Sequence, residues 1–409
     1  MKLNFLDQGS VSKNFHTMKI LCAVHENPGI SRSMLSKLEG ISKPTTTRIV
    51  DQLLQEKWLI ETGTIVNATS KRKPIGLTLN PNRFCCIGIT ISQNIIIAVI
   101  TDFEAKPLYE CHMAPINPQT PEELYKPIEE LIVKVILQAG KSEEDILGVG
   151  IGLPGLINKK TGMVTNYAFQ GILTDLPFQN ALQTRFSFPI LIDNNVNTLI
   201  LSEQIFPQNE FSRNSLFINY WGGIGAAAIL DGHLLAGSSN AVGEIGHTIV
   251  QPSGLKCRCG NLGCAETYCL PETICAMVSQ SLNRGRKSLL GSTDLPDIQR
   301  ILACWEKGDI LCSEHIMATA EKLSLCFANA INTLDPDTVI LSGEFFEYSE
   351  SFFNLVIERT REKLLRNDAG SIRFILRHAS DLNIRLGAVS LVFDAFFKRL
   401  PDDFIEFAE

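Results

Sequence analysis

The sequence predicts an α/β protein that begins with a winged helix-turn-helix domain. Three observations support this fold class. The apolar side chains of residues 11–57 are spaced as in three helices. After residue 84, short apolar runs typical of strands alternate with longer helical stretches. With 409 residues the chain is also too long for one compact core, so two or three domains are expected.

The N-terminal segment carries the local signals that start and stop helices. Ser31 and Ser42 stand where a side-chain oxygen caps a helix, and Pro44 fits the first turn of the third helix. Gly40 is suited to end the second helix. The three helices are expected over residues 11–25, over 32–38 and from 43 onwards, followed by short strands at 59–61 and 75–79.

A short helix, a turn, a capped helix and a basic hairpin follow one another as in DNA-binding winged helices. Hydroxyl side chains and two cations at the start of the third helix suit phosphates and base edges. The alternatives are a solvated helical bundle and, for the basic segment 70–74, a solvated charge run. The candidate DNA-binding residues are Ser42, Lys43, Thr45, Thr46, Arg48, Lys71, Arg72 and Lys73.

The charge of the chain is divided unevenly along its length. The formal net charge of −7 would by itself argue against nucleic-acid binding. Residues 1–80 nevertheless contain 11 Lys and Arg against six Asp and Glu, so this segment carries +5 and the remainder −12. A basic head on an acidic body is expected where only the head meets phosphate groups.

The chain after residue 84 shows α/β patterning. Two apolar runs end in glycine-rich turns, at residues 150–155 and 222–225, where glycine lets the backbone turn tightly or approach a ligand. Such turns alone are weak evidence for a ligand site. Strands are expected over residues 86–91, 95–101, 146–151, 190–192, 216–218, 226–230 and 338–341, and helices over residues 121–139 and 313–334.

One histidine and three cysteines form the most specific local pattern, which consists of His247, Cys257, Cys259 and Cys264. An imidazole and three thiolates match a closed four-coordinate zinc site, and the intervening glycines let a short loop fold around the ion. A closed ligand set leaves no position for water, so one structural Zn²⁺ per chain is expected. A redox pair is disfavoured because the spacing is Cys-x-Cys rather than Cys-x-x-Cys.

The cellular location is also indicated by the sequence. The first ten residues lack the apolar stretch of a secretory signal, and most other cysteines sit singly in apolar runs, as reduced core thiols do. The most apolar stretch, residues 85–100, is interrupted by polar residues and is too short to span a bilayer as a helix. We therefore expect a cytoplasmic protein without membrane insertion.

The cysteine pattern and further motifs resemble the ROK family, which groups bacterial sugar repressors, unassigned open reading frames and sugar kinases. The resemblance extends from about residue 84 to the C-terminus. The preceding winged helix resembles the head of the family's repressors, such as the xylose and N-acetylglucosamine regulators. The motifs are Gly152-Leu-Pro-Gly155, Asp193-Asn-Asn-Val-Asn197, Gly243-Glu-Ile-Gly-His247, the run 257–266, Leu334-Asp-Pro-Asp337 and Leu386-Gly-Ala388.

The resemblance implies a two-lobed, actin-like and ribonuclease-H-like sugar-kinase fold with a sugar in its cleft. The expected domains are a winged helix-turn-helix at 1–80 and a first α/β lobe at 81–198, completed by the C-terminal helix at about 387–409. A second α/β lobe at 199–386 would contain the zinc motif. This second lobe is also the expected dimerisation domain.

The resemblance also bears on catalysis. It places Asn195 where the family's kinases have the aspartate that takes a proton from the attacking sugar hydroxyl, and an amide cannot accept that proton. Neighbouring Asp193 is not expected to replace this base, because residues at different positions on a strand or turn point in different directions. The phosphate-binding turn is degenerate at residues 90–94, and Glu344 would repel a nucleotide. The chain is therefore expected not to be an enzyme.

The positions that hold sugar in the family are better kept. Carboxylates and amides pair with adjacent hydroxyls and so fix their stereochemistry. For Glu266 the alternative is a role as a hydrogen-bonding partner of the zinc loop, and for His247 both roles are open. The candidate sugar-binding residues are Gly155, Asn194, Asn195, Glu244, His247 and Glu266.

The leading hypothesis is a transcriptional regulator, with repression the first expectation, that controls sugar-metabolism genes. The ligand alters DNA affinity only if it favours one of two conformations. The expected partners are operator DNA, a sugar or sugar-phosphate effector and further copies of the chain, in a homodimer or a dimer of dimers. Two alternatives stay open: an active sugar kinase with an accessory head, and a regulator controlled by a phosphotransferase-system protein of sugar uptake.

Overall fold

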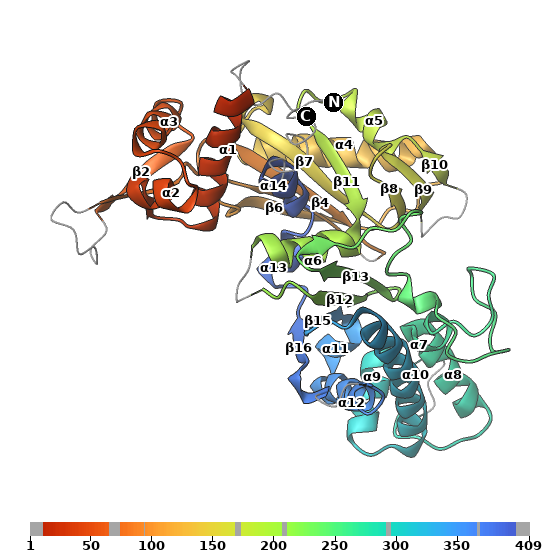
Figure 1. The fold of residues 1–409 in the computed structure, drawn as a ribbon. Coiled ribbons are helices and arrows are strands. Elements are labelled where there is room, and N and C mark those ends of the chain that lie inside the picture. The colour runs from red at the N-terminus through yellow and green to blue at the C-terminus, as the bar shows by residue number, and fades with distance from the viewer. Residues whose placement is uncertain are drawn as a thin grey trace.

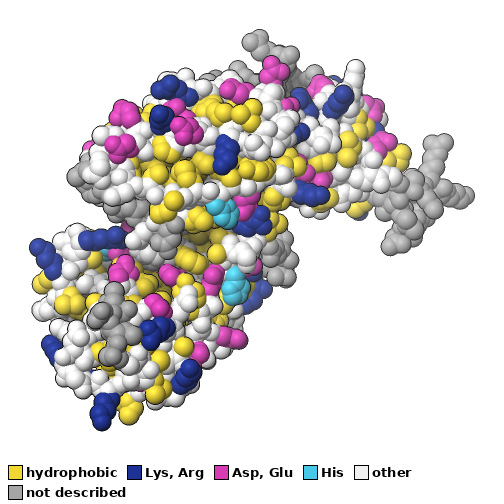
Figure 2. Space-filling model, turned by 180° about the vertical axis from the view of Figure 1, so that it is seen from behind, with side chains coloured by type: hydrophobic (Ala, Val, Ile, Leu, Met, Phe, Trp, Pro, Cys, Tyr) yellow, Lys and Arg dark blue, Asp and Glu magenta, His cyan; other side chains and the backbone are white. Residues whose placement is uncertain are grey.

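The protein consists of a small N-terminal head and two α/β lobes (Figure 1). The computed structural model describes residues 11–64, 74–93, 95–167, 173–206, 211–291, 296–365 and 369–397. The head lies at one end of the first lobe, and the second lobe extends away below both in the view of Figure 1. Figure 2, seen from behind, shows the two lobes as separate masses that meet at a narrower waist.

The head is a three-helix unit closed by a small sheet of order β1-β3-β2. Its elements are α1 (Val11–Glu26), β1 (Ile30–Ser31), α2 (Arg32–Leu38), α3 (Lys43–Gln55), β2 (Leu59–Thr64) and β3 (Ile75–Leu79). Both predicted caps are present, since the backbone N–H of Met34 donates to Ser31 Oγ and that of Thr45 donates to Ser42 Oγ, each at 3.3 Å. The three predicted helices and two predicted strands are confirmed.

The first lobe contains a mixed five-stranded sheet of order β11-β7-β4-β5-β6 and a three-stranded sheet of order β10-β9-β8. Its elements are β4 (Cys85–Ile91), β5 (Ile96–Thr101), β6 (Pro107–Met113), α4 (Pro121–Gln138), η1 (Glu143–Asp145), β7 (Ile146–Leu153), β8 (Gly155–Asn158), β9 (Met163–Tyr167), β10 (Thr174–Leu176), α5 (Phe178–Gln183) and β11 (Ile190–Asn194). The parallel strands β4, β7 and β11 direct their carboxyl ends toward the second lobe. Polar residues that follow them therefore gather at the waist.

The second lobe has a five-stranded sheet of order β14-β13-β12-β15-β16 with helices packed on it. Its elements are β12 (Ser215–Tyr220), β13 (Gly225–Leu230), β14 (His233–Leu234), η2 (Ile245–His247), α7 (Glu266–Cys269), α8 (Pro271–Asn283), α9 (Ile298–Glu306), α10 (Ile310–Leu334), β15 (Thr338–Gly343), α11 (Glu344–Tyr348), α12 (Glu350–Arg361), η3 (Ala369–Ser371) and β16 (Arg373–Arg377).

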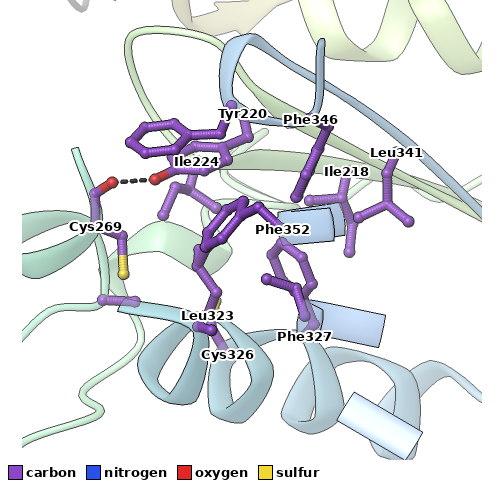
Figure 3. Close-up of a cluster of buried hydrophobic side chains, with 14 of the residues drawn as sticks. Ile218, Tyr220, Ile224, Cys269, Leu323, Cys326, Phe327, Leu341, Phe346 and Phe352 are labelled. Carbon is purple, nitrogen blue, oxygen red and sulfur yellow. Dashed lines mark hydrogen bonds between the residues drawn. The ribbon is translucent and has the colours of Figure 1, made fainter. Parts of the chain in front are cut away.

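An aromatic cluster fills the space between this sheet and its helices (Figure 3). The ring of Tyr220 stacks on Phe345 of α11 with the centroids 5.1 Å apart, and Phe352 of α12 packs against Phe345 at 5.4 Å. The buried hydroxyl of Tyr220 donates to the carbonyl oxygen of Cys269, so the only polar atom of this side chain is satisfied. The cluster fixes α7, which starts at the cleft, onto the sheet.

Three helices connect the lobes. They are α6 (Asn195–Ile205), α13 (Leu382–Arg385) and α14 (Val389–Phe397). Helix α6 packs on β13 of the second lobe and on α14, and α14 lies on strands β4 and β7 of the first lobe. The Ser390 hydroxyl of α14 lies 3.2 Å from the carbonyl oxygen of Thr198 in α6. A buried bidentate ion pair, at 2.7 and 2.8 Å, joins Glu203 of α6 to Arg377 at the end of β16.

The head shares one hydrophobic core with the first lobe. This cluster includes Leu21 and Leu53 of the head and Phe103, Val389 and Phe396 of the body. The segment between them is also pinned, because the backbone N–H of Asn80 donates to the carbonyl of Trp58 at 2.9 Å. Helix α14 therefore touches the head on one side and α6 on the other, which makes it the physical connection between them (Figure 1).

Most strands predicted from the sequence are found with boundaries shifted by one or two residues. Strand β6 was not predicted, since as an edge strand it is only half buried and has no clear alternation. The strands of the small sheet β8–β10 were missed for a related reason, because they are three to five residues long. Within the described residues, no helix combines the length and apolar character needed to cross a membrane.

Candidate functional site

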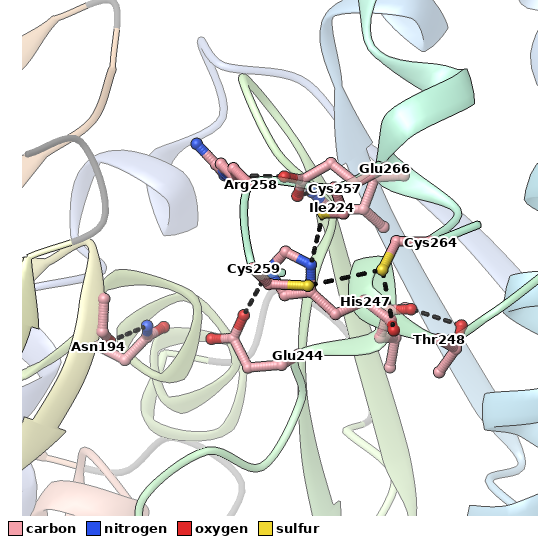
Figure 4. A network of polar contacts seen from close by, with 12 residues as sticks. Asn194, Ile224, Glu244, His247, Thr248, Cys257, Arg258, Cys259, Cys264 and Glu266 are labelled. Carbon is pink, nitrogen blue, oxygen red and sulfur yellow. Dashed lines mark hydrogen bonds and ion pairs between the residues drawn. The ribbon is translucent and has the colours of Figure 1, made fainter. Parts of the chain in front are cut away.

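A cleft of about 550 Å³ opens at the waist, between the strand ends of the first lobe and the cysteine-containing loop 257–266 of the second lobe. All six sugar-binding candidates from the sequence line it, and they are Gly155, Asn194, Asn195, Glu244, His247 and Glu266. The structure thus brings together residues separated by more than a hundred positions. Of these, Figure 4 shows Asn194, Glu244, His247 and Glu266 facing the same space.

Asn194 is held at the mouth of helix α6. Its Oδ1 accepts a hydrogen bond from the backbone N–H of Val196 at 2.8 Å, which makes it the N-cap of α6. Its Nδ2 donates to the carbonyl oxygen of Gly155 at 2.9 Å. Both ends of the amide are therefore fixed, and the side chain reaches the cleft in one orientation.

Asn195 makes a contact that an aspartate cannot make. Its Nδ2 donates to the carbonyl oxygen of Ile91 at 3.2 Å, at the end of strand β4. A carboxylate in the same position would bring two acceptor oxygens together. The amide thus joins α6 to the turn that follows β4.

Asp193 lies next to these amides but does not line the cleft. Its side chain is 1% exposed and forms an ion pair with Lys159. One carboxylate oxygen accepts from the backbone N–H of Asn194 at 2.7 Å and from Nδ2 of Asn197 at 2.9 Å. Asp193 is thus committed to holding the start of α6, as expected from its different position on the strand.

Glu266 is a buried carboxylate with two fixed partners. Its Oε2 accepts from the backbone N–H of Ile224 at 3.1 Å, and its Oε1 lies 2.8 Å from Arg258 Nη2. Glu266 is the first residue of α7, and its side chain is only 6% exposed. The Arg258 contribution was not foreseen from the sequence, although its place between two cysteines of the zinc pattern put it near the cleft.

The predicted zinc ligands converge on one point. The ligand atoms of His247, Cys257, Cys259 and Cys264 all lie within 4.8 Å of one another. The distance from Cys257 Sγ to His247 Nδ1 is 3.5 Å, and that from Cys259 Sγ to Cys264 Sγ is 3.6 Å (Figure 4). Ligands about 2.0–2.3 Å from a tetrahedral Zn²⁺ lie about 3.5–3.8 Å apart, so the cluster fits this ion.

The imidazole of His247 connects the metal cluster to the cleft. Its Nδ1 faces the thiols, and its Nε2 lies 3.9 Å from a carboxylate oxygen of Glu244. A carboxylate behind a metal-bound histidine orients the ring and strengthens it as a ligand. Glu244 therefore faces both the metal cluster and the cleft, and its side chain is 41% exposed.

Across the cleft, two turns close against each other. A Cβ atom on Gly222 would lie 2.2 Å from Oε1 of Gln93, so the glutamine side chain rests on the glycine backbone. Gly222 also has a φ of +62°, which favours glycine. Neighbouring Trp221 donates from Nε1 to the Ser342 hydroxyl at 3.0 Å. The degenerate turn at residues 90–93 thus packs directly on the second lobe.

The third helix of the head presents a polar face to solvent. Its exposed surface forms a shallow hollow lined by Lys43, Pro44, Thr47, Arg48, Asp51, Gln52 and Gln55. Thr46 points the other way and is 0% exposed, so its assignment as a DNA contact is corrected. Helical periodicity explains the difference, because residues 46, 49, 50 and 53 share the buried face.

The other candidate DNA contacts have different positions. Ser42 and Thr45 are bonded to each other through their hydroxyls at 2.8 Å at the helix start. Thr47 was not among the candidates, although it lies on the exposed face beside Arg48. The remaining candidates, Lys71, Arg72 and Lys73, lie outside the described residues.

Two family models match the chain. The ROK family model matches residues 86–395, and the MarR family model matches residues 16–60. A winged head with a capped third helix and a two-lobed α/β body with a cleft define the architecture of a regulator on a sugar-kinase scaffold. The chain belongs to the ROK family. The predicted family and fold class are confirmed.

Individual proteins resemble the chain over nearly its full length. It is 26% identical to the xylose repressor of Caldicellulosiruptor bescii over 386 residues, which cover 93% of this chain and 96% of that one. It is also 26% identical to the DNA-binding transcriptional dual regulator NagC of Escherichia coli over 383 residues, covering 93% and 92% of the two chains.

Solved structures share the fold. A ROK family transcriptional regulator, described as a homolog of the Escherichia coli MLC protein, has a TM-score of 0.81 at 22% identity, covering 95% of this chain and 98% of that one. A ROK glucokinase from Streptomyces griseus, in complex with glucose and AMPPNP, has a TM-score of 0.61 at 23% identity, covering 76% and 98%. The kinase thus corresponds to the body, and the regulator to head and body together.

Proposed function

We propose that the protein is a DNA-binding transcriptional repressor of sugar-metabolism genes whose DNA affinity responds to a sugar in the cleft. One observation carries the proposal: a helix that exposes Lys43 and Arg48 belongs to a head that shares a hydrophobic core with the lobe whose cleft is lined by carboxylate and amide side chains. The relatives that match along nearly the whole chain include repressors named for sugars.

The cleft suits a sugar because of its chemistry. Glu244 and Glu266 offer carboxylate oxygens that accept from hydroxyls, and Asn194 is fixed beside them. Such groups, placed in one orientation, discriminate between sugars that differ in a single hydroxyl. A role as a repressor requires only that the cleft bind the sugar, and the cleft provides hydrogen-bond acceptors for its hydroxyls.

We propose that Zn²⁺ at the cluster is structural. Three thiolates and an imidazole complete a four-coordinate set, which leaves no position for a reacting water. When bound, the ion supplies no chemistry to a substrate but holds the loop that carries Arg258 and Glu266. The His247 ring then presents its other nitrogen to Glu244, so the metal loop shapes the sugar site.

We propose that the cleft does not transfer phosphate. Asn195 replaces the required base with an amide that donates to Ile91, and Asp193 is buried in an ion pair. Gln93 rests on Gly222 where the two turns meet. A kinase role would need a proton acceptor that reaches the sugar hydroxyl.

In the proposed coupling, the signal runs from the cleft along α6 to α14 and the head. Asn194 and Asn195 begin α6, α6 packs on α14, and α14 shares the core of the head. Closure of the lobes around a sugar would move α6 relative to the first sheet. In a homodimer this changes the spacing of two heads, which a two-fold operator senses. We also propose a cytoplasmic location, because the proposed ligand of the head is operator DNA.

The experiment that tests the proposal is selection of DNA sequences from a random pool by the full-length protein. The expected result is a two-fold symmetric motif, bound with a strong dependence on salt. Binding to that motif should then change when a sugar panel is added. Failure to select any motif contradicts the repressor role, and turnover of ATP with a sugar would favour the kinase alternative.

A further inference from the structure

The charges that line the cleft are predominantly negative. Of the described residues that line it, Glu244 and Glu266 carry carboxylates, and Arg258 carries the one Lys or Arg side chain. One nitrogen of the Arg258 guanidinium lies 2.8 Å from Glu266, so this ion pair adds no net charge to the cleft. The net charge that a ligand meets in the cleft is therefore that of the Glu244 carboxylate.

Lys159, a cation that does not line the cleft, is also held in an ion pair. Lys159 pairs with Asp193, which is 1% exposed and lies behind the start of α6. Removing Lys159 from this pair to meet a ligand would leave a buried carboxylate uncompensated, which is costly. Lys159 is therefore not free to bind an anion in the cleft.

The proposed zinc centre adds to the negative charge. Three thiolates and one neutral imidazole around Zn²⁺ carry a net charge of −1. This centre lies directly behind the cleft, since His247 and Cys259 belong both to the cluster and to the cleft lining. Low-dielectric walls strengthen such a field inside a cleft.

Two backbone positions that otherwise attract a phosphate are occupied by the chain itself. The N-terminus of α6 is capped by Asn194, whose Oδ1 accepts from the N–H of Val196 at 2.8 Å. The glycine turn is covered on one side by Gln93, which rests against Gly222. A phosphate group entering the cleft would have to displace one of these side chains.

We infer that the effector is an uncharged sugar and not its phosphate ester, an inference that rests on the proposed sugar-binding function. The hydroxyls of an uncharged sugar donate to Glu244, whose oxygens have no hydrogen-bonding partner among the described residues closer than the 3.9 Å to His247. A phosphate dianion only accepts hydrogen bonds, and the carboxylates also only accept them, so the two groups cannot pair with each other. The cleft therefore favours the free sugar on both charge and hydrogen bonding.

The test measures binding of matched pairs to the zinc-loaded, full-length protein by thermal shift and calorimetry. Glucose, mannose, fructose and N-acetylglucosamine are each compared with their 6-phosphates, and xylose is added. We expect an uncharged sugar to bind at least about tenfold more tightly than its phosphate. Equal or tighter binding of a phosphate ester overturns the inference while supporting sugar responsiveness. Binding of no member contradicts the proposed function and the inference with it.

Two variants sharpen the result. Glu244→Gln removes one negative charge with little change in shape. It should weaken binding of the free sugar and reduce the ratio between the affinities for the free sugar and for its phosphate ester. Arg258→Met should leave the weak binding of the phosphate ester unchanged, because the guanidinium is paired with Glu266. A selective fall in ester affinity would identify Arg258 as a phosphate ligand and contradict the inference. Glu358→Gln, an exposed position on α12, is the matched control and should leave the ratio unchanged.

Discussion

The indole ring of Trp58 lies almost parallel to the ring of Phe396, with the centroids 5.8 Å apart and 14° between the planes. Trp58 follows the third helix of the head, and Phe396 belongs to α14 at the far end of the chain. Phe103 of the first lobe packs edge-on against both rings. The head is thus joined to the body by an aromatic core, not only by the chain connection.

Phe396→Ala should therefore loosen the head. Removing a buried aromatic side chain costs about 3–5 kcal/mol of stability, and the cavity falls on the contact between head and body. We expect reduced operator affinity and a smaller response of that affinity to sugar, measured by fluorescence anisotropy. The control is Phe352→Ala, a similarly buried change in the second lobe, which should lower stability without selectively reducing the sugar response.

Cys264→Ser should remove the metal and destabilise the second lobe. Metal analysis should fall from one zinc per chain to well under one, with the melting temperature lowered by roughly 10 °C because metal binding contributes to folding. Sugar binding should weaken in parallel, since the loop also positions Glu266. Cys275→Ser, a buried cysteine outside the cluster, serves as control and should keep its zinc. Full zinc content in Cys264→Ser would contradict the assigned ligand set.

Local signals explain how much of this structure was predictable from the sequence. Ser31 and Ser42 each cap a helix through a contact three residues away, so short-range chemistry determines both caps. The zinc cluster was equally accessible, because its four ligands span only 18 residues. Each of these features depends on neighbours in the sequence.

Other features depend on how the side chains pack in three dimensions, and these were missed. The Arg258–Glu266 ion pair and the contact of Gln93 with Gly222 both require knowledge of which surfaces meet. The junction between head and body was also hidden, since nothing in the residues around Trp58 indicates Phe396 as its partner. Helical periodicity of the third helix was the one signal that could have excluded Thr46.

Asn195→Asp should not convert the protein into a kinase. The new carboxylate would face the carbonyl oxygen of Ile91, where the amide now donates at 3.2 Å, at a cost of about 1–3 kcal/mol. Gln93 would still rest on Gly222. We expect a lower melting temperature and no sugar-dependent consumption of ATP in a coupled assay. Measurable turnover in this variant would show that a single substitution had suppressed an otherwise intact kinase.

Acid should weaken the junction through His25. Burial lowers the pKa of this histidine to about 4, and its ring stacks on Phe397 with the centroids 4.2 Å apart. Because the folded-state pKa is depressed, the unfolded chain binds the proton more readily, so stability is lost as the pH falls below about 6.5 toward 4. The loss should be about 1 kcal/mol between pH 7 and 5.5. The free energy of unfolding, measured in denaturant at each pH, should not show this loss in His25→Phe. It should still show the loss in His233→Gln, a substitution at an exposed site.

Substitutions on the two faces of α3 should affect operator binding differently. Arg48 is exposed beside Thr47, so Arg48→Ala should weaken operator binding by about 1–3 kcal/mol and flatten its salt dependence. Thr46 is fully buried, and its hydroxyl has no hydrogen-bonding partner among the described residues. Thr46→Val should therefore leave the operator affinity unchanged and the stability equal or higher. Valine has nearly the same shape as threonine but lacks the unsatisfied hydroxyl. Anisotropy titrations at several salt concentrations measure both effects. If Thr46→Val lost DNA affinity at unchanged stability, the assignment of the Arg48 face of α3 as the DNA-contacting face would be contradicted.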